Sequence, residues 1–248
     1  MEETNWKEMS LAVVDVETTG LNSASDRVIE VGIVHMRAGE VLERWGSLVN
    51  PGIPIPKAVR DITGIQQEDL EQAPTFKEIA DNVVTRLTGL PFVAYNLSFD
   101  RSFIIEELRR CQMELPSEPG LDPLVFARAQ LPWLRSKRLA DVAAELKIDL
   151  REAHRAKQDA EAAGRVLFGL APRLPDGLNM LLTLQKNWER EQEQAFALRR
   201  GKEPGLSGLD LGQASHGVIA LGPAYVYGDE VDPYRALFRA LPDARTKS

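Results

Sequence analysis

Short apolar runs rich in β-branched residues stand near the beginning of the chain. Residues 11–16 (LAVVDV) and 28–36 (VIEVGIVHM) have the length and composition of buried strands, and 41–49 follow as a third strand. The glycine-containing segment 37–40 lies between the second and third strands and predicts a hairpin turn. A fourth apolar run at 92–95 predicts one more strand. The first part of the chain therefore predicts a β-sheet.

Apolar residues recur at helical spacing between and after these strands, and Ser98 is expected to cap the helix that follows the fourth strand. The expected helices cover residues 57–61, 67–70, 74–87, 98–108, 122–130, 139–146 and 155–170. Strands first, then helices interleaved with one further strand, predict an α/β fold in which helices cover a mixed sheet.

A change of composition at Pro172 and Pro175 predicts a boundary between a domain at 1–171 and a C-terminal extension at 172–248. The extension is expected to hold one long helix and a glycine-rich loop, followed by a small hairpin and a short helix. These four segments cover residues 177–200, 201–217, 218–227 and 234–241.

Composition limits the classes of protein to consider. A hydrophobic fraction of 44% and a charged fraction of 27% are typical of soluble globular proteins. No apolar run reaches the length of a membrane span, the first residues lack a signal-peptide core, and the single cysteine excludes an intrachain disulfide. These features predict a cytoplasmic protein that makes no contact with a membrane.

Charge is distributed unevenly along the chain. The net charge is −7, and residues 1–170 account for all of it with 20 basic against 27 acidic residues. Residues 171–248 are balanced at 10 against 10. The overall field therefore repels a polyanion, and a nucleic-acid substrate would need bound cations and a local basic patch.

Two carboxylates interrupt the first apolar strand. Asp15 and Glu17 are two residues apart, so their side chains point to the same face of a strand. A carboxylate pair on an apolar strand is costly unless a cation compensates it, which indicates a metal site. A strand that ends in solvent with two exposed acids explains these residues equally well.

Two further positions place polar chemistry where a helix begins. Asp100 follows the fourth strand, and a favourable interaction with the helix dipole also explains it. His154 and Asp159 stand at the start of the helix expected at 155–170, where a solvated helix start is the simpler explanation of a lone histidine. Neither position identifies a site by itself.

Taken in order, the three patterns resemble the DnaQ-like, or DEDDh, family of 3′-to-5′ exonucleases, whose motifs read D-x-E, N-x-x-F-D and H-x-x-x-x-D. The corresponding residues are Asp15 with Glu17, Asn96 with Phe99 and Asp100, and His154 with Asp159. The resemblance spans roughly residues 10–170 and includes the proofreading, epsilon-type exonuclease subunit of bacterial DNA polymerase III. A sister branch carries tyrosine where this chain has Arg155, so the histidine branch is indicated.

The resemblance implies a ribonuclease H-like fold and hydrolysis of phosphodiester bonds at a 3′ end, with release of nucleoside 5′-monophosphates. It implies two divalent ions, Mg²⁺ or Mn²⁺, held by Asp15, Glu17, Asp100 and Asp159, and hard cations do prefer oxygen ligands. It also implies that His154 is the general base, a role that suits an imidazole with a pKa near 6.5.

The resemblance further implies contacts to the terminal nucleotide. The expected substrate-binding residues are Thr18, Thr19, Ile65, Asn96, Phe99 and Arg155. Phe99 and Ile65 have a structural alternative as core residues, and Arg155 as a solvated side chain. Thr63 stands where the family has a histidine, so a base contact from that position is not expected.

Three functions remain open on these residues. The first is an exonuclease acting on a single-stranded or frayed 3′ end, with DNA favoured over RNA. The second is an exoribonuclease that trims RNA 3′ ends, because the motifs do not separate the two substrates. The third is a non-catalytic nucleic-acid or polymerase interaction module, against which the presence of all five metal and base positions argues. The extension at 172–248 is expected to pack on the first domain and to bind a polymerase, another protein or a second copy.

Overall fold

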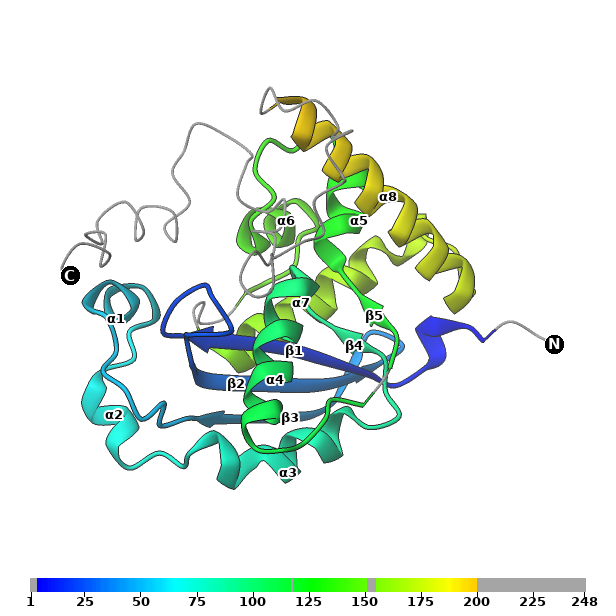
Figure 1. Ribbon diagram of the computed structural model, residues 1–248. Coiled ribbons are helices and arrows are strands. Elements are labelled where there is room, and N and C mark those ends of the chain that lie inside the picture. Colours follow the sequence, from blue (N-terminus) through cyan, green and yellow to red (C-terminus); the bar gives the residue numbers. More distant parts are fainter. Residues whose placement is uncertain (1–3, 117, 151–154, 200–248) are drawn as a thin grey trace, which may run out of the picture.

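A five-stranded mixed sheet forms the centre of the molecule in the computed structural model, which describes residues 4–116, 118–150 and 155–199 (Figure 1). Its strands are β1 (Leu11–Thr18), β2 (Val28–Arg37), β3 (Glu40–Leu48), β4 (Phe92–Val93) and β5 (Gly120–Leu121), in the order β3-β2-β1-β4-β5. β1, β2 and β3 are antiparallel neighbours, whereas β4 pairs parallel with β1 and with β5. The predicted mixed sheet is confirmed, while His154 and the segments predicted beyond residue 199 lie outside the described residues.

The first three predicted strands are confirmed, with ends shifted by one or two residues. Ala38 and Gly39 form the predicted hairpin turn with φ values of 51° and 83°. The fourth strand is shorter than predicted, and β5 was not predicted. A two-residue strand is too short to show an alternating pattern, and β5 exists only because it pairs with β4.

Helices cover both faces of the sheet (Figure 1). The apolar side chains of α3 (Phe76–Leu87) and α4 (Leu97–Arg110) pack on one face, and those of α5 (Pro123–Gln130), α6 (Leu139–Glu145) and α7 (Ala156–Leu170) pack on the other. Two short helices, α1 (Lys57–Thr63) and α2 (Gln67–Glu71), close a small separate core beyond one end of the sheet. All of these helices were predicted, with small shifts of their ends.

The start of α4 differs from the prediction. The helix begins at Leu97, so Ser98 lies inside it and Asn96 occupies the cap position with a left-handed φ of 78°. The buried carboxylate of Asp122 holds this turn, because it accepts hydrogen bonds from the backbone N–H groups of Asn96 and Leu97 at 3.0 Å each. A side chain that is distant in sequence therefore sets the helix start.

Two glycines let α7 lie directly on the sheet. A Cβ atom at Gly32 of β2 would overlap the backbone of Ala156 and Lys157, and one at Gly164 would overlap the Met36 side chain. Gly32 pairs with Asp15 across the β1–β2 ladder. The first turn of α7 therefore sits against the sheet next to the carboxylates of β1.

The last described helix, α8 (Leu178–Arg199), docks on the same side of the sheet as α5 (Figure 1). Leu181 is fully buried, and Trp188 meets Phe126 of α5 edge to face at 6.2 Å. Its amide side chains also bond to the rest of the fold, since Gln185 accepts from the N–H of Asp122 at 2.9 Å and Gln192 donates to the carbonyl of Val125 at 3.0 Å. Within the described part of the chain, none of the helices combines the length and the apolar character that crossing a bilayer requires.

Candidate active site

Asp15 and Glu17 project from β1 toward α7, on the face of the sheet that Val13 shares with the α7 core. Asp159 comes from the first turn of α7. One carboxylate oxygen from each of these three residues lies within 4.8 Å of the other two. Two segments about 140 residues apart thus form one acidic cluster, which the family resemblance implied.

Asp100 approaches the same strand from the other side. β4 ends at Val93, so the N–H of Val16 on β1 extends beyond the parallel ladder and is free to bond elsewhere. One carboxylate oxygen of Asp100 accepts that N–H at 3.0 Å, and Asp100 is only 3% exposed. This bond places Asp100 at the edge of β1, outside the cluster of three but close enough for charge interactions with Asp15 and Glu17.

The electrostatics of the site are dominated by acids that face one another. Burial, and after it the charges of Asp100, Asp159, Glu17 and Glu30, raise the pKa of Asp15 well above its ordinary value. Burial also raises the pKa of Asp100, although its bond from Val16 opposes that shift. A concentration of negative charge in a desolvated place favours a bound cation, and carboxylate oxygens are the ligands of hard divalent ions. The donor set therefore suits a divalent cation.

Glu30 on β2 is a further carboxylate of this region, and it is buried; the sequence did not single it out. It stands opposite Glu17 in the β1–β2 ladder and is 5% exposed. Its oxygens accept hydrogen bonds from the guanidinium of Arg155 at 3.0 to 3.3 Å and from the backbone N–H of Ala156 at 3.3 Å. Glu30 thereby ties the start of α7, and with it Asp159, to the sheet.

Arg155 is exposed and engages Glu30, so the position expected to contact substrate also holds the helix start. His154 precedes it immediately and lies outside the described residues, which leaves its expected role as general base a prediction. A signal for Glu30 does exist in the sequence, since it is an acid inside the apolar run VIEVGIV. Its partner on α7 could not be read from that run.

The side chains of Thr18 and Thr19 are engaged within the fold. Thr18 and Thr19 are buried, and both hydroxyl groups bond to the backbone of the loop after β1. The Thr18 hydroxyl donates to the carbonyl of Gly20 at 2.6 Å, and the Thr19 hydroxyl accepts from the N–H of Arg27 at 2.9 Å. Their side chains therefore hold the loop, and a substrate contact from either position stays a prediction.

Phe99 and Ile65 contribute to packing. Phe99 is half-buried, with its ring 4.9 Å from that of Phe103, and Ile65 is 4% exposed in the small core below α1 and α2. Asn96 sits in the turn held by Asp122, whose own pKa is raised by burial. A substrate contact from these three positions stays a prediction.

Comparison with known proteins agrees with this geometry. The family model RNase_T, described as Exonuclease, matches residues 12–167. The chain is 37% identical over 170 residues to a DNA polymerase III of the PolC type from Oceanobacillus iheyensis, and 33% identical over 159 residues to the 3′-5′ exonuclease DinG of Staphylococcus epidermidis. These alignments cover 68% and 64% of this chain but 12% and 18% of the relatives. The chain thus corresponds to a small part of much longer proteins.

Solved structures share the fold at lower identity. Exonuclease X in complex with 5′ overhanging duplex DNA aligns over 71% of this chain and 99% of its own, with a TM-score of 0.58 and 19% identity. E. coli Exonuclease I in complex with a dT13 oligonucleotide aligns over 66% of this chain and 42% of its own, with a TM-score of 0.60 and 19% identity. The nuclease domain of 3′hExo, a DEDDh family member bound to rAMP, aligns over 67% of this chain and 93% of its own, with a TM-score of 0.57 and 16% identity. The expected ribonuclease H-like fold is confirmed, and the chain belongs to the RNase_T, or DnaQ-like, exonuclease family.

Proposed function

We propose that this protein is a metal-dependent 3′-to-5′ exonuclease that releases nucleoside 5′-monophosphates from DNA 3′ ends. The observation that carries the proposal is the convergence of Asp15, Glu17 and Asp159, whose ligand atoms lie within 4.8 Å of one another in a member of the exonuclease family. Carboxylates this close repel one another and so destabilise the fold, and bound cations would offset that repulsion.

Two divalent ions, Mg²⁺ or Mn²⁺, are the proposed cofactor. Asp15, Glu17 and Asp159 would hold them, with Asp100 at the edge of β1 as the fourth ligand. Such ions supply charge neutralisation at the phosphoryl group and activation of a water molecule. The protein's part is to fix the ligands, which the bonds of Glu30 to α7 and of Val16 to Asp100 accomplish.

His154 is the proposed general base, five residues before Asp159. It would accept the proton of the attacking water and so favour attack on the terminal phosphodiester. Removing a positioned general base typically costs 10² to 10⁴ in rate. His154→Ala is expected to lower kcat by about 10² or more while metal affinity, measured by calorimetry with Mn²⁺, stays within about threefold of wild type.

DNA is the proposed substrate for two reasons. One relative is named as a DNA polymerase and another as a 3′-5′ exonuclease, and two solved neighbours are complexes with DNA. RNA is the second candidate, since 3′hExo is described as bound to rAMP and a related structure as recognising a histone mRNA stem-loop. Mononucleotide release from 5′-labelled single-stranded DNA, duplex DNA and RNA, with Mg²⁺, distinguishes them. Faster release from RNA than from either DNA would reject the DNA assignment, and no release from any of them would reject the activity.

We also propose a cytoplasmic location and an association role for residues 172–248, with a polymerase, another protein or a second copy as partner. The support is that α8 docks on α5 while the apolar residues predicted at 218–227 and 234–241 follow it in the chain. Light scattering of the full chain and of a chain ending at Arg199, each alone and mixed with polymerase, tests this role. Identical masses and no co-elution in both cases would reject it.

A further inference from the structure

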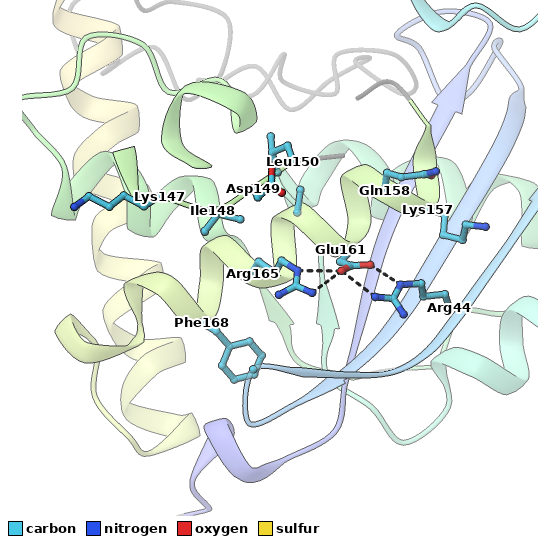
Figure 2. Close-up of a pocket in the computed structure, with 12 residues that line it drawn as sticks. Arg44, Lys147, Ile148, Asp149, Leu150, Lys157, Gln158, Glu161, Arg165 and Phe168 are labelled. Atoms are coloured by element: carbon cyan, nitrogen blue, oxygen red, sulfur yellow. Dashed lines mark hydrogen bonds and ion pairs between the residues drawn. The ribbon is translucent and has the colours of Figure 1, made fainter. Parts of the chain in front are cut away.

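A charged groove runs along α7 (Figure 2). The residues of α7 that line it lie on a different face of the helix from Asp159. Its volume is about 810 Å³, and its walls are α7, β3 and the segment that follows α6. Figure 2 shows Arg44 of β3 reaching toward α7 on one side, with residues 147–150 on the other. None of the residues expected to hold metal or substrate lines this groove.

The groove is basic although the protein is acidic. Its charged lining consists of four cations and two anions, namely Arg44, Lys147, Lys157, Arg165, Asp149 and Glu161. The excess of two positive charges stands against a net charge of −7 for the whole chain. A negative protein that acts on a polyanion needs a local positive surface of this kind.

Glu161 arranges two of these cations as a pair. It accepts hydrogen bonds from Arg44 at 2.5 and 3.0 Å and from Arg165 at 2.9 and 2.7 Å. The bond from Arg44, above all, keeps the pKa of Glu161 below its ordinary value, so the acid stays ionised and holds both guanidinium groups. One carboxylate thus orients two guanidinium groups, and the triad keeps a net charge of +1.

Both arginines retain capacity for an anion. A guanidinium has five N–H donors on three nitrogens, and each arginine uses only Nε and one terminal nitrogen for Glu161 among the contacts of the described residues. Their side chains are 47% and 43% exposed. Planar donors that are held in place and open to solvent suit the oxygens of a phosphate group.

Lys157 extends the basic wall toward the active site. Its aliphatic stem lies over Gly46 of β3, where a Cβ atom would be 3.5 Å from the Cβ of Lys157, and Arg44 lies on that same face of the strand. Asp159 follows two residues later on α7 but faces β1. From Lys157 to Arg165 the helix rises about 12 Å, the axial length of about three to four stacked nucleotides at 3.4 Å each.

We infer that this groove binds the phosphodiester backbone of the substrate strand, several nucleotides on the 5′ side of the bond that is cut. The inference rests on the proposed nuclease function. Arg44, Lys157 and Arg165 would then strengthen the binding of long strands without taking part in the chemistry at the carboxylates. A substrate too short to reach the groove gains nothing from these residues.

The test uses the double variant Arg44→Gln/Lys157→Gln, in which Glu161 keeps Arg165 as its partner. Binding of fluorescent single-stranded oligothymidylates of 2, 4, 8 and 12 nucleotides is measured by anisotropy with Ca²⁺ over a series of salt concentrations. The variant is expected to bind the 12-mer about tenfold more weakly at low salt and to lose about 1.4 from the slope of log affinity against log salt, at 0.7 for each single-strand phosphate contact. Its affinity for the dinucleotide is expected to be unchanged.

The matched control is Lys77→Gln/Arg109→Gln, which removes the same charge from α3 and α4 on the opposite face of the sheet. Equal weakening in the control would reduce the effect to net charge and overturn the inference. Equal weakening for the 2-mer and the 12-mer, or unchanged binding of the 12-mer, would overturn it as well. Hydrolysis of thymidine 5′-monophosphate p-nitrophenyl ester with Mn²⁺ tests the proposed function independently, and the groove variant is expected to hydrolyse it within about twofold of wild type.

Discussion

Glu107 on α4 and Asp15 on β1 are both largely removed from solvent, yet their carboxylates meet opposite surroundings. Glu107 is 1% exposed and accepts hydrogen bonds from Arg27 at 2.7 and 3.0 Å and from the N–H of Val28 at 3.2 Å, with Arg110 3.1 Å away. The bond to Glu107 is the main reason that the pKa of Arg27 is raised. Here a buried acid is fully compensated by the fold.

Asp15 faces acids instead. Burial and four neighbouring carboxylates all push its pKa upward. Glu30 lies between the two cases, since it adds to the charge near Asp15 but is itself bonded to Arg155. The difference indicates that the fold pairs its structural acids with arginines and leaves the metal-binding ones to be compensated by a ligand.

The largest expected effect comes from neutralising Asp15. Asp15→Asn keeps the shape of the side chain but removes one ligand charge, so exonuclease activity with Mg²⁺ is expected to fall by about 10³ or more. Glu107→Gln, the same chemical change in the compensated cluster, is expected to keep activity within about tenfold below its melting temperature. Similar losses of kcat in both variants would contradict the distinction between a metal-binding Asp15 and a structural Glu107.

Stability is expected to respond in the reverse order. Glu107→Gln leaves Arg27 and Arg110 without their buried partner and is expected to lower the free energy of unfolding by about 3 kcal/mol. The control is Glu106→Gln, which affects a more exposed ion pair with Arg109 and is expected to cost less than about 1 kcal/mol. Urea denaturation measures both, and equal values for the two variants would contradict the assignment of Glu107 as a structural acid.

Gly32→Ala tests how closely α7 must approach the carboxylates. The new methyl group would displace the first turn of α7 and so move Asp159, which is expected to cost about 1 to 3 kcal/mol of stability and to lower kcat by about 10². Its partner across the β2–β3 ladder, Gly46, is the control, because a Cβ there first meets the carbonyl of Val31 at 3.2 Å. If Gly46→Ala lost as much stability and kcat as Gly32→Ala, a specific role for the close contact between Gly32 and α7 would be contradicted.

The smallest expected effect is a dependence of stability on pH. In the metal-free protein the pKa of Asp15 is raised above its ordinary value of 3.8, so between these two values the folded state binds more protons than the unfolded state. The free energy of unfolding therefore falls as pH rises through that window, and Asp15→Asn is expected to have the higher Tm above it. Calorimetry in EDTA is expected to show this gain shrinking toward pH 4. Adding Mg²⁺ is expected to favour wild type, and a variant that stays less stable in EDTA at pH 8 would contradict the proposed repulsion.

Sequence patterns predicted those parts of the site that depend on local geometry. The two-residue spacing of Asp15 and Glu17 fixes their common face on any strand, and the position of Asp159 in the first turn of its helix follows from the apolar pattern after it. The same patterns located three long strands and the covering helices.

Pairings between distant segments could not be predicted in this way. Glu30 meets Arg155 across 125 residues, and Asp122 sets the start of α4 through bonds that span 25 and 26 residues. Neither contact leaves a periodic signal, because each depends on sheet register and helix packing rather than on spacing along the chain. β5, two residues long, is defined by its neighbour alone.

The docking of α8 determines where the cooperative folding unit ends. Gln185 supplies the hydrogen-bond partner of the buried Asp122 N–H and also donates to the carbonyl of Gly120 at 3.2 Å, and Gln192 bonds Val125. A chain that stopped at residue 167, the end of the family match, would lack Leu170, expose Phe126 where Trp188 now covers it, and leave these backbone groups to water. The segment beyond the family match thus belongs to the same cooperative unit, and α8 is expected to unfold together with α5 rather than before it.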